Sequence, residues 1–389
     1  MSNYCIQIGK DNQSLDEIID FLAKVYGPNY YDAKRIQGLI IRKEPSTAPQ
    51  NFILARSIDN ELIGIIRIVE RKIRLGSAIL KCGGISSVSA HPDWRGQGVV
   101  REMMDTAHEA MIRRGMDISF LYARRALDGY YTQFGYYGIN RYLDLEIISA
   151  VAGEERLSIS PFRQENISAI SVKYNEVYSC LSGSIVRDEK IWTFLISKMK
   201  GTEGNISLFE CHVVESDELI GYLIVSDDKL IEIAIPQNYF SHLPRLIKKL
   251  GLKYISIHPY HPFYKYVRTS FSTIQRERFS LDGGYMGRIL DFSSLLSKIC
   301  PDICLRASGI AVTGTIRLFG YELELQSGKI SRATGTDDIA FKNENTVIQL
   351  ILGIHSLEDY SGVFLNSEKH WLNYLFPCTG FHTSALDEI

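Results

Sequence analysis

The sequence predicts a mixed α/β and α+β fold, in which two related units, each built on one β-sheet, precede a smaller module of sheet and helices. Three observations lead to this prediction. A glycine-bearing turn at residues 95–98 separates an apolar strand pattern from a helical one. Part of this unit recurs further along the chain. The C-terminal part changes to short alternating segments between glycines. A length of 389 residues fits two or three domains.

The first unit begins with a helix followed by antiparallel strands. Ser14-Leu15-Asp16-Glu17 has the form of a capping box and predicts a helix to about Tyr26. Alternating apolar residues then predict a hairpin and a segment that leads into the next strand, over 51–57, 62–71 and 73–80. This order places a layer of helix against an antiparallel sheet.

The turn Arg95-Gly96-Gln97-Gly98 is the most informative local feature. It follows an apolar strand at 85–90 and opens a helix at 99–114. The first N–H groups of such a helix are unpaired, and the positive end of the helix dipole favours a pyrophosphate there. The turn therefore predicts a phosphate site, with a purely structural turn as the alternative.

A second apolar strand, 118–123, and a tyrosine-rich segment, 129–136, follow that helix. In this order the residues resemble the GNAT acetyltransferases. The fingerprint of that family is R-x-x-G-x-G/A on the pyrophosphate of acetyl-CoA, followed by a tyrosine in Y-x-x-F-G-[YF]. Arg95 and Gly98 match the fingerprint, whereas Val100 stands where most members have glycine or alanine. The second motif matches as Tyr131-Thr132-Gln133-Phe134-Gly135-Tyr136.

A partial internal repeat follows. Glu61-Leu62-Ile63-Gly64 recurs as Glu218-Leu219-Ile220-Gly221, and Gly115 before one strand is echoed by Gly251 before another. The second copy is shorter, and the missing residues fall where the pyrophosphate turn should be. We therefore expect a degenerate second GNAT unit at 151–292 that does not bind acetyl-CoA.

The C-terminal segment, 293–389, has a different pattern. Short strands are expected at 310–318, 321–326 and 329–333, with Gly320 and Gly328 at turns, and helices begin near 346 and 368. This part resembles the sterol carrier protein fold. The resemblance implies either a scaffold or an apolar groove for lipid.

An active GNAT unit (1–150), a degenerate one (151–292) and a sterol-carrier-like domain (293–389) together resemble the enhanced intracellular survival (Eis) acetyltransferase family. In that family a bulky aliphatic residue stands at the position of Val100. The resemblance implies a C-terminal tail that reaches the active site and a homo-oligomer, which in that family is a hexamer. It also implies an acceptor that is an aminoglycoside-like polyamine or a protein lysine.

The same resemblance assigns the site residues. The general acid is Tyr131, and the general base is the carboxylate of the C-terminal residue, Ile389. The contacts to acetyl-CoA carry over to one strand end, the turn and the helix start, which comprise Val88, Ser89, Ala90, Arg95, Gly96, Gln97, Gly98, Val99, Val100 and Arg101.

The chemistry of acetyl transfer is compatible with these residues. Tyr131, with an ordinary pKa of about 10, can protonate a departing thiolate whose thiol has a pKa of about 8.5. Core packing is the alternative role for Tyr131, because the chain has 22 tyrosines. Since 81–88 contains no glutamate, the base must lie elsewhere, and Glu70 is the alternative to Ile389.

Composition excludes several other functions. The 43 basic and 45 acidic residues favour neither nucleic acid nor an anionic membrane as partner. The chain shows no signal-peptide pattern and no long apolar window, so a cytoplasmic protein is expected. The cysteines form no C-x-x-C pair, and prolines interrupt His258-Pro259-Tyr260-His261-Pro262, so no metal is expected. The prediction is an acetyl-CoA-dependent N-acetyltransferase. The alternative is a non-catalytic acyl-CoA or lipid-binding module.

Overall fold

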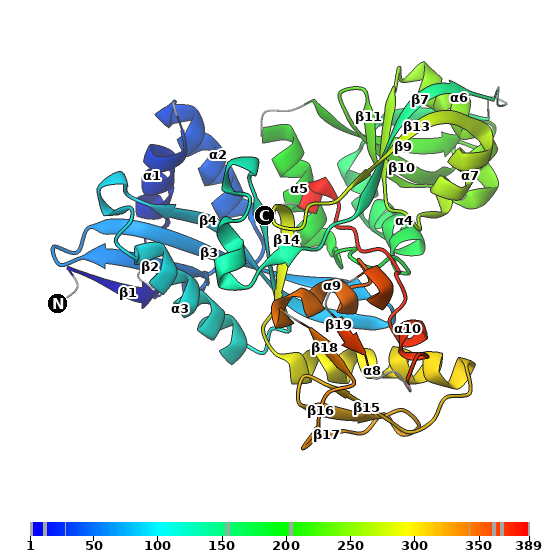
Figure 1. Ribbon diagram of the computed structural model, residues 1–389. Helices are drawn as coiled ribbons and strands as arrows, with labels where there is room; N and C mark the ends of the chain where they lie inside the picture. Colours follow the sequence, from blue (N-terminus) through cyan, green and yellow to red (C-terminus); the bar gives the residue numbers. More distant parts are fainter. Residues whose placement is uncertain are drawn as a thin grey trace.

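A computed structural model describes residues 3–10, 14–27, 29–151, 153, 156–201, 205–341, 343–359, 363–365 and 369–387. The chain forms three lobes, coloured blue to cyan, green and yellow to red in Figure 1. Two of them are built on seven-stranded sheets, and the third holds smaller sheets and helices. This arrangement confirms the predicted fold class. No helix in the described ranges is long and apolar enough to cross a membrane.

The first sheet has the order β1-β2-β3-β4-β5-β14-β6. One face packs against α3 and the other against α1 and α2 (Figure 1). Among the described strands of this sheet, only β4 and β5 pair in parallel. The elements are β1 (Tyr4–Ile8), α1 (Leu15–Tyr26), α2 (Tyr30–Lys43), β2 (Phe52–Ser57), β3 (Leu62–Leu75), β4 (Ala78–Ala90), α3 (Val99–Arg113), β5 (Ile118–Ala123), β6 (Tyr137–Gly138) and β14 (Gly284–Ile289).

Local signals place several of these elements correctly. Ser14 caps α1, and its Oγ accepts a hydrogen bond from the Glu17 N–H at 3.3 Å, as the capping box predicts. The segment 73–80, in contrast, is not one strand. β3 runs on to Leu75, the chain reverses at Gly76, and β4 begins at Ala78. The long hairpin forms because its apolar end packs in the core of the third lobe.

The second sheet has the order β13-β7-β12-β11-β10-β9-β8. From β8 to β11, neighbouring strands pair antiparallel, and β11 then pairs in parallel with β12. The first sheet has the same order, with β4 and β5 as its parallel pair. The repeat in the sequence therefore corresponds to a repeated topology. The elements are β7 (Tyr142–Ala150), β8 (Leu157–Pro161), α4 (Ile167–Tyr178), α5 (Glu189–Gly201), β9 (Ile206–Val213), β10 (Leu219–Ser226), β11 (Lys229–Ala234), α6 (Leu243–Lys249), β12 (Tyr254–Ile257), α7 (Pro262–Ser270) and β13 (Phe271–Arg278).

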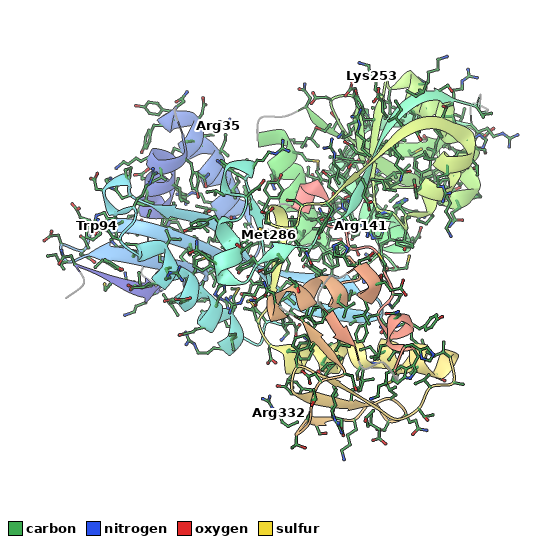
Figure 2. The ribbon with its side chains drawn as sticks, in the orientation of Figure 1. Arg35, Trp94, Arg141, Lys253, Met286 and Arg332 are labelled. Carbon is green, nitrogen blue, oxygen red and sulfur yellow. The ribbon has the colours of Figure 1, made fainter. Side chains whose placement is uncertain are left out.

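The two sheets exchange strands along the sequence. β7, which precedes residue 150, lies in the second sheet between β12 and β13. β14, which precedes residue 292, lies in the first sheet beside β5. The division at 150 and 292 stays a prediction, and the sheets themselves cross it twice. Met286 of β14 accordingly lies near the centre of the molecule (Figure 2).

In the second sheet, side chains bind the backbone of β11 beyond the point where it pairs with β12. Tyr178 Oη accepts a hydrogen bond from the Ile233 N–H at 3.3 Å, and His261 Nε2 donates to the Ile233 carbonyl at 3.1 Å. No glycine lies between β11 and α6. Both features support the expectation that this unit does not bind acetyl-CoA.

The third lobe packs against the long hairpin of the first. Short strands occur in each predicted segment, but 310–314 are not strand, and α8 was not expected. A cavity of about 50 Å³, between this lobe and the end of the hairpin, is too small for an acyl chain. Its elements are α8 (Phe292–Gly309), β15 (Thr315–Leu318), β16 (Tyr321–Glu324), β17 (Ile330–Arg332), β18 (Ile339–Phe341), α9 (Val347–Ile351), β19 (Val363–Leu365) and α10 (Leu372–Leu375).

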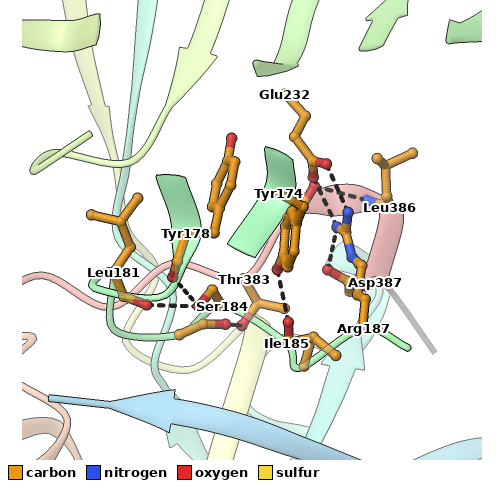
Figure 3. A network of polar contacts seen from close by, with 12 residues as sticks. Tyr174, Tyr178, Leu181, Ser184, Ile185, Arg187, Glu232, Thr383, Leu386 and Asp387 are labelled. Atoms are coloured by element: carbon orange, nitrogen blue, oxygen red, sulfur yellow. Dashed lines mark hydrogen bonds and ion pairs between the residues drawn. The ribbon is translucent and has the colours of Figure 1, made fainter. Parts of the chain in front are cut away.

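The end of the described chain returns to the second lobe. Arg141, labelled in Figure 2, donates its backbone N–H to the Phe381 carbonyl at 2.9 Å. Further on, Asp387 pairs with the buried Arg187 at 2.7 Å, and Arg187 also binds Glu232 through two nitrogens, at 2.7 and 2.8 Å (Figure 3). Although burial lowers it, the two carboxylates raise the pKa of Arg187 well above its usual value. This buried ion triad fixes the tail.

Two buried histidines, His258 and His261, lie near the half-buried His382 of this tail. Burial lowers the pKa of His258 to about 4, and burial with the neighbouring imidazoles lowers that of His261 and His382 to about 3. His258 Nδ1 accepts from the Tyr260 N–H at 2.9 Å, and its Nε2 donates to the Ser182 carbonyl at 3.1 Å. The neutral imidazole satisfies both contacts, so neither nitrogen is available for a metal.

Acid is expected to destabilise the protein through these histidines. In the unfolded chain they protonate near pH 6.5, whereas in the folded protein they stay neutral down to pH 3–4. The unfolded state therefore binds more protons in this window, and stability is full above pH 6.5 and falls as the pH is lowered through it. Each histidine should cost about 2 kcal/mol at pH 5.

Urea unfolding at pH 7 and pH 5 measures this loss. His261→Asn should reduce the difference between the two pH values by roughly a third. The matched control is the exposed His370, for which His370→Gln should leave the difference unchanged. A wild-type free energy of unfolding that is equal at both pH values would contradict the assignment.

Candidate active site

The parallel strands of the first sheet separate at their C-terminal ends. β4 pairs with β5 from Cys82 to Ile85, and β4 then continues to Ala90 without β5. At the same place the register of β4 against β3 shifts by one residue, and Ser87 takes a positive φ of 55°. Such a bulge bends a strand away from its neighbour. The bend opens a cleft between β4 and β5.

A cavity of about 400 Å³ lies in this cleft. Its walls come from β3, β4 and β5, from α1 and α2 of the first lobe, and from α5 of the second. Its lining residues include Tyr26, Glu44, Arg67, Val88, Arg124, Tyr131, Phe194 and Lys198. The cavity therefore joins the first two lobes.

Of the predicted strand residues, Val88 reaches the cavity. Ser87 and Val88 are skipped in the pairing with β3, and the described pairing with β5 ends before them. Tyr26 Oη donates to the Val88 carbonyl at 2.7 Å and fixes this peptide. Ser89 and Ala90 pair with β3, are buried and do not line the cavity. Val88 is thus the one of the three predicted strand residues that lines the cavity.

The glycine turn has the backbone that the sequence predicts. Gly96 and Gly98 have φ values of 76° and 86°, which favour glycine. Gly98 is the N-cap of α3, and no side chain caps that end. The Glu102 N–H donates a hydrogen bond to the carbonyl of this N-cap residue at 3.2 Å. The N–H groups that precede it, on Val99, Val100 and Arg101, lie at the positive end of the helix.

The side chains of the turn have different roles. Gln97 Nε2 donates to the Asp93 carbonyl at 2.8 Å and so braces the turn. Arg101 Nη2 donates to Gln133 Oε1 at 2.7 Å, which links the helix start to the tyrosine-rich segment. Arg95 is exposed. Arg95 is therefore the side chain of the turn most accessible to an anion.

Tyr131 lies in a short 3-10 helix between two glycines of positive φ, Gly129 and Gly135. Its ring is 6% exposed and lines the cavity. Burial raises the pKa of Tyr131 above its usual value, the neighbouring Tyr26 and Tyr130 add to this, and Arg124 opposes it. The phenol is therefore protonated at neutral pH and can donate a proton.

The two glutamates that could serve as the base are both paired with arginines. Glu70 does not line the cavity and pairs with Arg114 on the surface. Glu44 does line it, but both its oxygens bind Arg71, at 2.8 and 2.7 Å. Burial raises the pKa of Glu44, but its contacts to Arg71 outweigh burial and leave it lowered. Ile389 lies outside the described residues.

The tail nevertheless ends close to the cavity. Lys198, a lining residue from α5, donates to the Leu386 carbonyl at 3.5 Å. Sequence reasoning missed Lys198, Phe194 and Tyr26 as site residues, because helices from separate parts of the chain bring them together. It also missed Arg67, although one signal was present. Arg67 is a lone charge within the apolar strand Leu62–Val69 of the sequence.

Comparison with known proteins defines the class. Residues 10–139 match the model of the acetyltransferase (GNAT) domain. Residues 10–139 therefore form a GNAT acetyltransferase domain, a domain type that uses acetyl-CoA as co-substrate. Among curated proteins, no sequence matches significantly.

Solved structures resemble the whole chain. A GCN5-related N-acetyltransferase from Anabaena variabilis has a TM-score of 0.73 at 13% identity, covering 99% of this chain and all of its own. A probable N-acyltransferase from Enterococcus faecalis has a TM-score of 0.71 at 14% identity, covering 100% of both chains. Eis1 from Mycobacterium abscessus has a TM-score of 0.67 at 13% identity, covering 99% of this chain and 100% of its own. Identities this low establish the fold alone.

Proposed function

We propose that the protein transfers the acetyl group of acetyl-CoA to an amine bound in the cavity between β4, β5 and α5. The observation that carries this proposal is the position of Val88 and Tyr131 on one cavity, where the bulged strand leaves β5. The proposed cofactor contacts are the strand Val88–Ala90 and the turn and helix start, residues 95–101. The pyrophosphate binds the N–H groups of the turn and the side chain of Arg95.

The reaction needs few groups. The neutral amine attacks the thioester carbonyl carbon, and the developing oxyanion binds the Val88 N–H. When the intermediate collapses, the carbon–sulfur bond breaks and Tyr131 gives its proton to the thiolate. The amine proton leaves through a base. The base we propose is the terminal carboxylate of Ile389, acting directly or through water.

The family resemblance supplies the remaining proposals. It offers an aminoglycoside-like polyamine or a protein lysine as acceptor, a cytoplasmic location and a homo-oligomer, which the resemblance suggests is a hexamer. The likeness to Eis1 extends over the fold of the whole chain.

Release of the coenzyme A thiol tests the function. Acetyl-CoA is incubated with a panel of polyamines, aminoglycosides, lysine peptides and amino acids, and the product is weighed by mass spectrometry. We expect thiol release matched by one added acetyl group on at least one amine. No release with any amine, despite measured acetyl-CoA binding, would reject the proposal.

Shortening the tail tests the base. A chain that ends at Asp387 keeps the ion pair to Arg187 but loses the proposed carboxylate position. We expect kcat to fall by about 10²-fold or more, the usual contribution of a general base, with little change in acetyl-CoA affinity. Unchanged turnover would remove the tail from the mechanism.

A further inference from the structure

Arg67 is a buried cation without a full set of partners. The side chain is 2% exposed and lines the cavity from β3. Its Nη2 donates to Ser86 Oγ at 3.4 Å, but Nε and Nη1 have no hydrogen-bond partner within the described chain. Burial lowers the pKa of Arg67 to about 10, which still leaves it charged at neutral pH. A buried charge of this kind is costly unless something pairs with it.

The neighbouring carboxylate does not pair with Arg67. Glu44 binds Arg71 through both oxygens, and Glu44 Oε1 also accepts from the Ser46 N–H at 3.2 Å. Glu44 therefore hydrogen-bonds Arg71 and acts on Arg67 only through its charge, which opposes the lowering of the Arg67 pKa by burial. Every other arginine of the described ranges with an unsatisfied buried nitrogen lacks only one partner, whereas Arg67 lacks two. Arg67, a residue that lines the cavity, is thus the least satisfied arginine of the described ranges.

The wall of the cavity is cationic. Arg67, Arg124 and Lys198 line it, and the one carboxylate among the described lining residues is the paired Glu44. Such a wall repels a polycation and attracts an anion. In the proposed complex the phosphates of the cofactor bind at the glycine turn, and its thioester end carries no charge. The anion that pairs with Arg67 must then come from the acceptor or from the proposed terminal carboxylate, and because that carboxylate serves as the base, we assign the pairing to the acceptor.

We propose that the acceptor is a small amino-carboxylate, such as a free amino acid, whose carboxylate binds Arg67 while its amine faces the thioester near Val88. This inference rests on the proposed function and narrows it. A guanidinium donates strong charge-assisted hydrogen bonds to carboxylates. The cavity of about 400 Å³ also has to hold the thioester end, so the acceptor is small.

Matched acceptors test the proposal. The common amino acids and their α-amides differ only in the carboxylate, and kcat/KM is measured for both series. The wild type should prefer at least one free acid by on the order of a hundredfold, the effect of losing one partner of a buried charge pair. Arg67→Met should remove this preference. The control Arg113→Met, at an exposed arginine of α3, should keep it.

Stability shows whether Arg67 is structural instead. Because Arg67→Met removes an unpaired buried charge, its thermal midpoint should equal or exceed that of the wild type. A large drop in the midpoint, together with an unchanged acid preference, would make Arg67 a structural residue and overturn the proposal.

Product binding separates this inference from the proposed function. Calorimetry with N-acetyl amino acids in the presence of coenzyme A should detect binding in the wild type and not in Arg67→Met. If N-acetyl amino acids bind but no amine is acetylated, the carboxylate site at Arg67 is supported and the proposed transferase function is rejected. If polyamines are acetylated and Arg67→Met does not change their rate of acetylation, the carboxylate site is rejected and the transferase function stands. If N-acetyl amino acids bind only to the chain shortened to Asp387, the tail itself occupies the site at Arg67 in the full chain. This result would also reject the inference.

Discussion

Tyr131→Phe is expected to lower kcat by about 10²- to 10⁴-fold, the usual contribution of a positioned general acid. Only the hydroxyl is lost, and the phenyl ring keeps its contacts in the core that it shares with Phe134 and Met286. The acetyl-CoA affinity should stay within about twofold, because the proposed cofactor contacts lie on β4 and the turn. Stopped-flow thiol release and calorimetric titration measure the two quantities.

The neighbouring tyrosine provides the control. Tyr130 is partly exposed, and its ring packs on that of Tyr131 with centroids 5.0 Å apart. Tyr130→Phe should retain nearly full kcat. Since burial raises the pKa of Tyr131, the wild-type rate should also show no alkaline loss from this phenol below about pH 10. Equal rates for Tyr131→Phe and the wild type would leave Tyr131 as a packing residue.

Arg187→Met is expected to have the largest effect on stability, with a loss of about 3–5 kcal/mol in the free energy of unfolding. The change leaves the carboxylates of Glu232 and Asp387 buried without their shared cation. It also removes a guanidinium that lies 4.3 Å from the ring centre of Tyr174 and 4.8 Å from that of Trp192. Chemical unfolding followed by circular dichroism measures the loss.

An exposed ion pair shows what burial adds. Arg113 pairs with Glu109 at 3.3 Å on the surface of α3. Arg113→Met should cost less than about 0.5 kcal/mol, as exposed helix pairs do. Equal losses for Arg113→Met and Arg187→Met would contradict the account of the tail as held by a buried charge network.

Elements with strong local signals were predicted well. α1 has its capping box, α3 follows two glycines, and β5 is a short apolar run, so each is specified by its own residues. α2 was missed because it buries only Ile41 and so has a weak apolar stripe. α8 was missed because it carries Pro301 in its interior, which usually ends a helix. The extent of the β3–β4 hairpin depends on a core that another lobe supplies.

The candidate site also contains residues that the sequence identified and residues that it did not. Motifs identified Tyr131 and the turn, because spacing along the chain carries those signals. Arg67, Phe194 and Lys198 meet only after three distant segments pack together, so no motif contains them. For Arg67, the lone charge in an apolar strand was the available sign, and its missing partners became visible only in the structure.

The most direct test of the central claim is a crystal structure of the protein with acetyl-CoA bound. We predict that the thioester lies between β4 and β5, with its oxygen at the Val88 N–H, its sulfur within hydrogen-bond reach of Tyr131 Oη, and the pyrophosphate at residues 96–101. A thioester bound in the second lobe, or one that leaves Val88 and Tyr131 without contact, would contradict the account.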